Sequence, residues 1–145
     1  MTLSHQDKTQ SLERFIGAQN TCYEEVIHEL KQGLKTSHWI WYIFPQVVGL
    51  GFSEYSVYYG IKDLLEAKAY WDNDLLRARY EECLQLIMDS HKRPKEVLGV
   101  IDAKKLQSSL TLFLQVDGES ELINAAIKSL YAKKLDMKTI AILST

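Results

Sequence analysis

The segment from Ser37 to Ser53 reads SHWIWYIFPQVVGLGFS and combines aromatic rings with a few side chains that can bind or react. His38 can act as a general base or bind a phosphate, because an imidazole changes its charge near neutral pH. Gln46 precedes a Gly-Leu-Gly loop, so its carboxamide can offer a donor and an acceptor to the edge of a flat ring. Each also has a structural interpretation, in which the side chain only satisfies nearby backbone groups. The segment predicts a partly apolar pocket for a small planar or nucleotide-like ligand.

Hydroxyl and cationic side chains outside this segment complete the candidate site. Arg79 and Lys105 can bind a phosphate or a carboxylate, with a salt bridge to a neighbouring acid as the competing interpretation. Lys105 also lies four residues before Ser109, the spacing of a serine–lysine nucleophile pair, although chance produces that spacing often. The catalytic residues stay unknown. The candidate ligand-binding residues are His38, Trp39, Gln46, Ser53, Tyr59, Arg79, Lys105 and Ser108.

Several reaction types lack their usual sequence signatures. The histidines are scattered and form no HExxH, CxxC or carboxylate–histidine cluster, so we expect no metal and no cofactor. Cys22 and Cys83 lie among apolar neighbours and are interpreted as buried, inert thiols. An ADP-ribose or nucleotide glycosidic hydrolase is the enzymatic version of the ligand-binding hypothesis. That chemistry needs a carboxylate pair, and Glu54 is the single acid between Thr36 and Ile61.

Composition limits the domain organisation and the partners. The chain has 145 residues, of which 46% are hydrophobic and 25% charged, as in ordinary globular proteins. We expect one domain over residues 1–145, with residues 1–10 as a flexible N-terminal lead. A net charge of -2 predicts no affinity for a nucleic acid polymer or an anionic membrane. The polar N-terminal residues contain no apolar targeting segment, which predicts a cytoplasmic protein.

Apolar residues recur at helical spacing along most of the chain, which predicts an all-α, irregular single-domain bundle of about six to eight helices. Two short helices are expected first, because Thr21 and Glu24 form a capping box that separates residues 8–19 from a helix ending at Gly33. Ser37 is the expected cap of a short helix that Pro45 stops. Later helices are predicted for residues 63–72, 73–90, 94–99, 102–114, 119–133 and 136–143. Asp63 is the expected cap of the first of these, Asp72 or Asn73 of the second, and Asp102 of the fourth.

The aromatic residues concentrate in the first half of the chain. Eight of the fifteen fall between Trp39 and Tyr59, and this segment is expected to pack against the helices that begin at residues 73 and 102. Trp39 and Trp41 point to different sides of a helix, so one is expected in the core and the other at a cleft. Tyr55 and Tyr58 support an alternative function, a protein-interaction module without chemistry whose partner is unknown. A purely structural role is the third possibility.

Long strings of the sequence resemble a known family. The strings LERFIGAQ, ELKQGLKTSHWIWYIFPQVVGLGFS, YGIKDLLEAKAYW, LRARYEECL and DAKKLQSSLTLF are similar to the bacterial domain-of-unknown-function family 1810, whose members are sometimes labelled calpastatin-like. The resemblance extends from about Leu12 to Leu143. It implies a mainly helical fold and no established reaction. Trp71 stands where the family usually has leucine, and Asn73-Asp74 replaces its usual histidine-proline.

Overall fold

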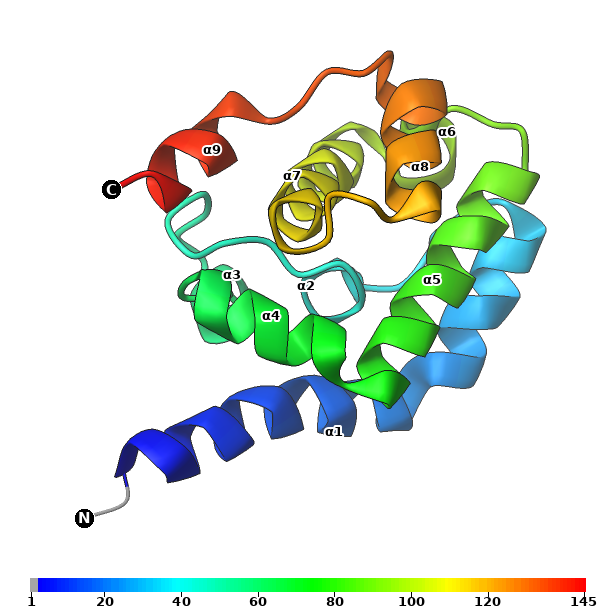
Figure 1. The fold of residues 1–145 in the computed structure, drawn as a ribbon. Helices are drawn as coiled ribbons and strands as arrows, with labels where there is room; N and C mark the ends of the chain where they lie inside the picture. Colours follow the sequence, from blue (N-terminus) through cyan, green and yellow to red (C-terminus); the bar gives the residue numbers. More distant parts are fainter. Residues whose placement is uncertain (1–2) are drawn as a thin grey trace.

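The computed structural model describes the backbone of residues 3–145 and the side chains of residues 12–145, and it confirms the all-α prediction (Figure 1). This described part contains nine helices, one more than the upper end of the expected range, and the helix that the sequence did not predict is α3, which has five residues. It contains no strand, only an isolated parallel bridge between Val47 and Ile61. The helices are α1 (Leu3–Gln32), α2 (Ile40–Ile43), α3 (Glu54–Tyr58), α4 (Leu64–Asp72), α5 (Asp74–Asp89), α6 (Pro94–Leu98), α7 (Val100–Val116), α8 (Glu121–Tyr131) and α9 (Met137–Leu143).

α1 is one long, bent helix, so the prediction of two short helices at the start of the chain is wrong. Thr21 does not cap a helix, because its hydroxyl donates to the carbonyl oxygen of Gly17 one turn earlier (3.0 Å). A threonine that bonds back to its own helix leaves the helix continuous and often bends it. Figure 1 shows the bend where the ribbon changes from dark to light blue. The predicted end of this helix at Gly33 is confirmed, with φ of 75° at that glycine.

The expected flexible lead overlaps the start of α1. The backbone of residues 3–10 belongs to α1, whereas Met1 and Thr2 lie outside the described residues. Flexibility of this lead stays a prediction.

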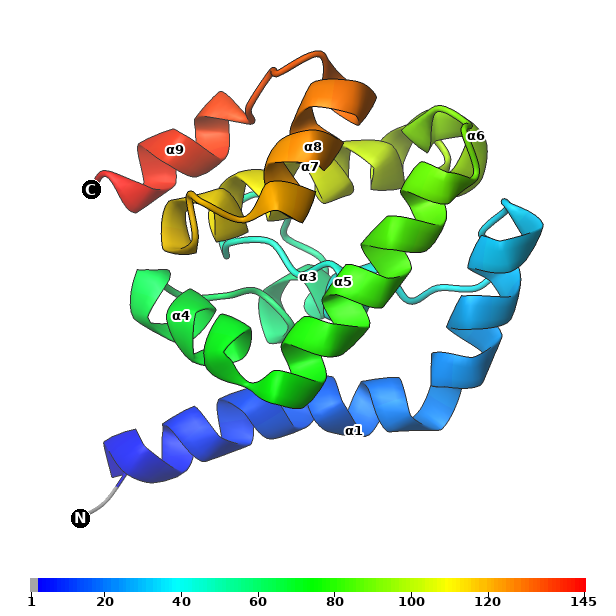
Figure 2. The same ribbon diagram turned by 45° about the vertical axis from the view of Figure 1, so that its right-hand side comes forward.

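α7 is the central helix of the bundle. It packs against α4, α6, α8 and α9, while α1 packs against α5 on the other side of the core (Figures 1 and 2). Aromatic rings fill the space between these helices, and Trp71 stacks on Phe113 at 5.2 Å between ring centroids. The Trp71 indole N–H also donates to Asp117 (3.2 Å). The larger side chain at position 71 therefore enlarges a core contact, as its size predicts.

Local helix caps agree with the sequence in some places and not in others. Asp63 and Asn73 cap α4 and α5 as predicted, since their side chains accept from the backbone N–H three residues later. Ser37 does not cap α2, because its hydroxyl donates instead to the buried carboxylate of Glu29 (2.6 Å). Asp102 does not cap α7 either. It lies inside the first turn of that helix and pairs with Lys35 (2.8 Å).

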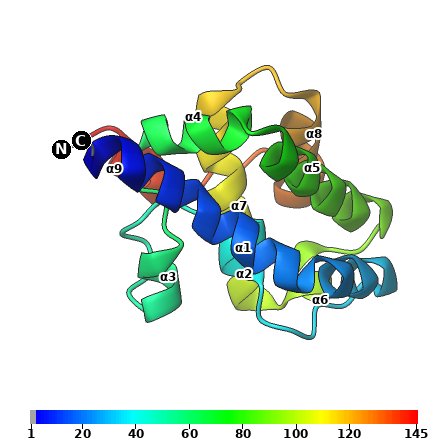
Figure 3. The same cartoon turned by 90° about the horizontal axis from the view of Figure 1, so that it is seen from below.

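The aromatic segment packs in the bundle as expected, and it also contacts a third helix. α2 packs against α5 and α7, and in addition against α1. Residues 46–61 form a loop whose ends are joined by two backbone hydrogen bonds, from Ile61 N to Gln46 O (2.9 Å) and from Val48 N to Ile61 O (2.8 Å). The loop carries α3, which projects from the edge of the molecule in Figure 3. None of the described helices is both long and apolar enough to span a membrane.

Candidate functional site

A groove with aromatic walls lies between α1, α2 and α3, and we call it the aromatic groove. Its volume is about 390 Å³. Small side chains of α1 leave the space open, and rings from α2 and α3 form its walls. The lining residues are Ala18, Thr21, Cys22, His38, Trp41, Tyr42, Tyr55 and Tyr59.

Four rings of the groove contact one another in a row. The centroid of Trp41 lies 4.8 Å from that of Tyr55, which lies 6.3 Å from Tyr59. Tyr59 in turn lies 5.2 Å from Tyr42. All three pairs are tilted, the geometry that aromatic pairs prefer over a face-to-face sandwich. A flat ligand would therefore meet π faces in several directions.

The phenols of Tyr42 and Tyr59 are uncharged at neutral pH. Burial raises the pKa of Tyr42, and the hydrogen bond from the Cys22 thiol (3.4 Å) raises it further. Burial also raises the pKa of Tyr59, together with the neighbouring Tyr58. The Tyr42 hydroxyl donates to the carbonyl oxygen of His38 (3.4 Å). The groove therefore offers neutral hydroxyls, and His38 is the residue of its wall that can carry a positive charge.

The indole N–H of Trp41 lacks a hydrogen-bond partner. Among the residues whose side chains are described, it is the one buried side-chain nitrogen or oxygen in this situation. The corresponding groups of Trp39 and Trp71 donate to Glu29 and Asp117. A buried donor left without an acceptor costs about 1–3 kcal/mol. Trp41 is a residue of the groove wall, but its indole nitrogen is buried, so an acceptor on a ligand reaches it only if a neighbouring side chain moves.

Glu29 fixes the segment that carries His38 and leads into α2. Glu29 is 3% exposed. It accepts from the backbone N–H groups of Thr36 (2.7 Å) and Ser37 (3.0 Å), from the Ser37 hydroxyl (2.6 Å) and from the Trp39 indole (3.0 Å). Burial alone would raise the pKa of Glu29, but the hydrogen bonds from Ser37, Thr36 and Trp39 outweigh it and lower this pKa to about 2. Glu29 is thus an anion that holds one wall of the groove in place.

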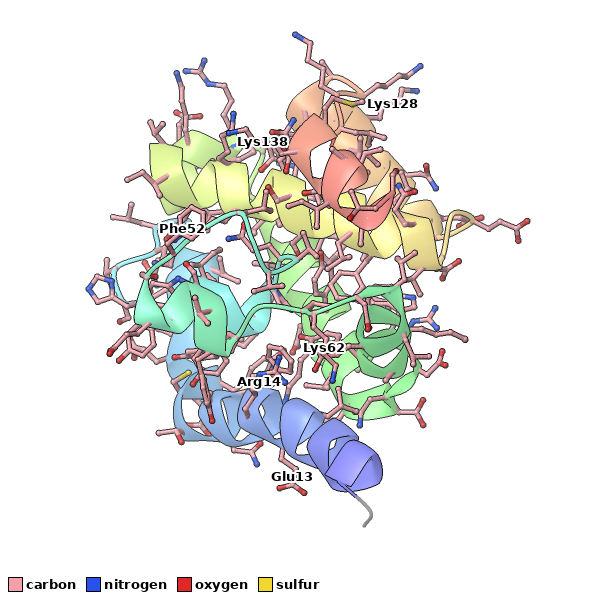
Figure 4. The ribbon with its side chains drawn as sticks, turned by 90° about the vertical axis from the view of Figure 1, so that its left-hand side faces the viewer. Glu13, Arg14, Phe52, Lys62, Lys128 and Lys138 are labelled. Atoms are coloured by element: carbon pink, nitrogen blue, oxygen red, sulfur yellow. The ribbon has the colours of Figure 1, made fainter. Side chains whose placement is uncertain are left out.

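Arg14 fixes the opposite wall. Its guanidinium donates to the carbonyl oxygens of Tyr58 (2.7 Å) and Gly60 (3.0 Å), at the end of α3. It also pairs with the buried carboxylate of Glu66 on α4 (3.1 Å). Figure 4 shows Arg14 pointing from α1 into the molecule, whereas Glu13 points away. One arginine therefore ties α3 to both α1 and α4.

Two of the eight predicted site residues, His38 and Tyr59, line the aromatic groove. Lys105 lies beside it, with its ammonium 5.0 Å from the ring centroid of Trp41. Trp39 is a core residue, 1% exposed, while Trp41 borders the groove. The prediction that one of these two rings lies in the core and the other at a cleft is therefore confirmed.

The other predicted residues lie outside the groove. Gln46 is buried at the closed end of the loop, where its backbone oxygen accepts from Ile61. Ser53 caps α3 by accepting from the backbone N–H of Ser56 (3.1 Å). Arg79 donates to Gln19 (3.3 Å) and borders a separate hollow on α1. Ser108 donates to Asp136 (2.8 Å), next to α9.

The serine–lysine pair is not formed. The hydroxyl of Ser109 is fully buried and shares a hydrogen bond with Tyr80 (2.9 Å), while Lys105 extends over Trp41. In the part of the chain that the structure describes, no group of three histidine, cysteine, aspartate or glutamate residues is arranged to hold a metal ion.

Sequence reasoning missed the residues that support the groove. Glu29 gave a signal, because an acid beside Val26 and Leu30 interrupts a stripe of apolar residues, and an acid in such a place needs buried donors. The prediction of a buried thiol holds for Cys83 and is wrong for Cys22, which is only partly buried and whose side chain helps to line the groove. Arg14 gave no signal, since its three partners are distant in sequence.

Comparisons with known proteins agree with the fold and its sequence motifs. Residues 9–143 match the family described as a protein of unknown function, DUF1810. Among solved structures, the conserved hypothetical protein Rv1873 from Mycobacterium tuberculosis is similar, with 39% sequence identity and a TM-score of 0.89. The similarity covers 92% of this chain and 96% of that one. None of the curated proteins compared with the sequence matches it. Because the family match covers nearly the whole sequence, this chain belongs to the DUF1810 family.

Proposed function

We propose that this protein binds a small planar ligand in the aromatic groove. The observation that carries the proposal is the combination of four contacting rings with a buried indole N–H that has no partner among the described residues. Ligand sites in proteins are typically apolar hollows with a few polar groups that fix orientation. Here the polar groups are the Trp41 N–H, the hydroxyls of Tyr42 and Tyr59, and the imidazole of His38.

The rings favour a flat ligand over an aliphatic one. Stacking of a base on an aromatic side chain contributes about 1–3 kcal/mol and tolerates different ring types. Tyr55 is 57% exposed and sits on a helix of five residues, so its ring can adjust over a bound ring more easily than a core side chain. An acceptor on the ligand that reaches Trp41 would add a hydrogen bond and remove the cost of the unpaired donor.

The proposal is for binding rather than hydrolysis. The residues that line the aromatic groove include no aspartate and no glutamate. Glycosidic hydrolysis ordinarily uses a pair of carboxylates on either side of the bond that breaks. Glu29, the buried carboxylate nearest in sequence to His38, already accepts four hydrogen bonds. The hydrolase version of the hypothesis therefore has no support from the geometry.

A pair of matched substitutions tests the proposal. Ala18→Leu adds bulk to the wall of the groove, while Ala78→Leu adds the same bulk to an exposed position of α5. Each protein is melted with adenine, adenosine, nicotinamide and their phosphorylated or carboxylated relatives. We expect at least one compound, at about 100 times its Kd, to raise the Tm of the unmodified protein and of Ala78→Leu by roughly 5–10 °C. Ala18→Leu should show no shift.

Two results would contradict the proposal. The first is a panel in which no compound changes the Tm of the unmodified protein. The second is a shift that Ala18→Leu retains in full, which would place the ligand outside the aromatic groove.

A protein-interaction module is the second candidate function, and the exposed apolar residues on and beside α3 favour it. Phe52 is 86% exposed and Tyr58 59%, and Tyr55 and Val57 are exposed beside them. Phe52 lies at the edge of the molecule in Figure 4. Monomeric proteins rarely expose several large apolar side chains together without a use for them. The double substitution Phe52→Ser and Val57→Ser separates the two functions, since neither residue lines the aromatic groove. Ligand binding should survive it, whereas binding of a protein partner should not.

A cytoplasmic location is also a proposal. Cys22 and Cys83 are both free thiols, which fits a reducing compartment. Fractionation of cells tests this expectation.

A further inference from the structure

Two lysines share one aspartate next to the aromatic groove. Lys35 Nζ lies 2.8 Å from one carboxylate oxygen of Asp102, and Lys105 Nζ lies 3.7 Å from the other. The three side chains are only 7%, 22% and 17% exposed for Lys35, Lys105 and Asp102. Two ammonium groups and one carboxylate give this cluster a net charge of +1. Charged groups with so little exposure are usually balanced by a partner.

The positive cluster lies behind the wall of the aromatic groove rather than in its lining. Lys105 Nζ lies 5.0 Å from the ring centroid of Trp41, a residue of the groove wall. Lys35 and Asp102 line a second hollow of about 440 Å³ at the start of α7. His38 lines both hollows, so they meet at its side chain. The cluster and the aromatic groove are therefore neighbours.

The nearby carboxylates do not offset this charge inside the groove. Glu29 is bonded to the segment that precedes α2, and its low pKa keeps it an anion that four donors already surround. Glu54 lines a different hollow, on the outer side of α3. Among the residues whose side chains are described, Asp102 is the counter-ion of Lys105, and their separation of 3.7 Å is too long for a hydrogen bond.

We infer that the planar ligand of the aromatic groove carries an anionic group, a phosphate or a carboxylate, that binds Lys105 and His38 next to Trp41. This inference rests on the proposed function. The flat part of the ligand stacks among the rings, and its anionic group neutralises the surplus charge of the Lys35–Asp102–Lys105 cluster. The attraction is strong because the lysines are shielded from water. Asp102 keeps Lys35 and Lys105 close together, so its role is to position the cations.

Matched ligand pairs measure the contribution of the anion. Adenosine is compared with adenosine monophosphate, and nicotinamide with nicotinate, by isothermal titration calorimetry. We expect the anionic member of at least one pair to bind about tenfold more tightly than the neutral member at low salt. The preference should shrink as the salt concentration rises, because ions screen the attraction. The two pairs show whether a phosphate or a carboxylate is preferred.

Lys105→Met tests the role of the ammonium group. Methionine keeps an unbranched chain over Trp41 and removes only the charge. We expect this variant to lose the preference for the anionic ligand, while its affinity for the neutral ligand stays within twofold. The control is Lys104→Met, which removes the same charge from an exposed neighbour on α7. It should keep the preference.

The outcomes separate this inference from the proposed function. If neutral and anionic ligands bind equally well to the unmodified protein, the proposed function stands and the inference is wrong. A preference that survives in Lys105→Met, or that Lys104→Met loses to the same extent, also overturns the inference. If no compound of the melting panel binds, these four included, both the proposed function and the inference fail.

Discussion

At the scale of single residues, buried polar groups determine the shape of the site more than the apolar residues do. The Glu29 carboxylate accepts four hydrogen bonds from the segment before α2. This segment has no helix or strand in which its N–H groups could otherwise find acceptors. Trp39 enters the core with its indole N–H paired, and Trp41, two residues later, enters the groove with its N–H unpaired. The same residue type therefore has a paired indole N–H at one position and an unpaired one at the other.

The low pKa of Glu29 predicts a specific pH dependence of stability. Its pKa in the folded protein is about 2, below the ordinary value of 4.5. The stability that the carboxylate contributes is therefore complete above about pH 4.5 and is lost as the pH falls toward 2. Glu29→Gln lacks this titrating group. We expect the difference in unfolding free energy between the two proteins to shrink between pH 6 and pH 3, measured by urea denaturation.

Glu25→Gln is the control, because Glu25 is exposed on the same helix. It should follow the unmodified protein within about 0.5 kcal/mol at both pH values. A constant difference between Glu29→Gln and the unmodified protein at both pH values would show that the carboxylate does not hold the segment as described.

At the scale of elements, the sequence predicts helices well where their signals are local. The side chains of Asp63 and Asn73 accept from the backbone N–H groups three residues later, so each cap is made within its own helix. The cap predictions are wrong where the side chain bonds instead to a residue distant in the sequence. The Ser37 hydroxyl donates to Glu29, and the Asp102 carboxylate pairs with Lys35, so neither side chain caps a helix. These partners lie eight and sixty-seven residues away, and a pattern confined to one helix cannot contain them.

Gly17, inside α1, and Gly33, just after its last residue, predict opposite effects of the same substitution. A Cβ at Gly17 would meet no atom within 4 Å, and this glycine sits inside α1. Gly17→Ala should therefore stabilise the protein by about 0.5–1 kcal/mol. Gly33 has φ of 75°, and a Cβ there would lie 2.9 Å from Lys92 Nζ. Gly33→Ala should destabilise the protein by about 1 kcal/mol or more. Urea denaturation measures both changes, and equal signs would contradict the account of α1.

The last helix depends on a cluster of buried hydroxyls. Asp136 accepts from Ser108 (2.8 Å) and from Thr139, and its backbone N–H donates to Thr111 (2.9 Å). Asp136→Ala removes the carboxylate that accepts from Ser108 and Thr139. We expect faster amide hydrogen exchange in α9 and a loss of about 2 kcal/mol in unfolding free energy. Lys138→Ala, at an exposed position on the same helix, should change neither (Figure 4). Unchanged exchange in Asp136→Ala would contradict this role.

At the scale of the whole molecule, the groove exists because three successive helices, α1, α2 and α3, meet at one edge. α1 supplies small side chains, α2 supplies Trp41 and Tyr42, and the loop of residues 46–61 brings in Tyr55 and Tyr59. Arg14 joins the first and last of these elements. The sequence locates the aromatic segment that forms two walls, and it predicts His38 and Tyr59. It does not predict Ala18 or Cys22, because a wall made by small residues is invisible until the helices are packed.

The most direct test of the ligand site is the indole N–H signal of Trp41 in a ¹H–¹⁵N NMR spectrum. The protein has three tryptophans, and two of their indoles are already bonded, to Glu29 and to Asp117. Addition of adenosine monophosphate should move the Trp41 signal downfield as its N–H gains an acceptor, and leave the Trp39 and Trp71 signals in place. A saturating addition that leaves the Trp41 signal where it was would contradict the site.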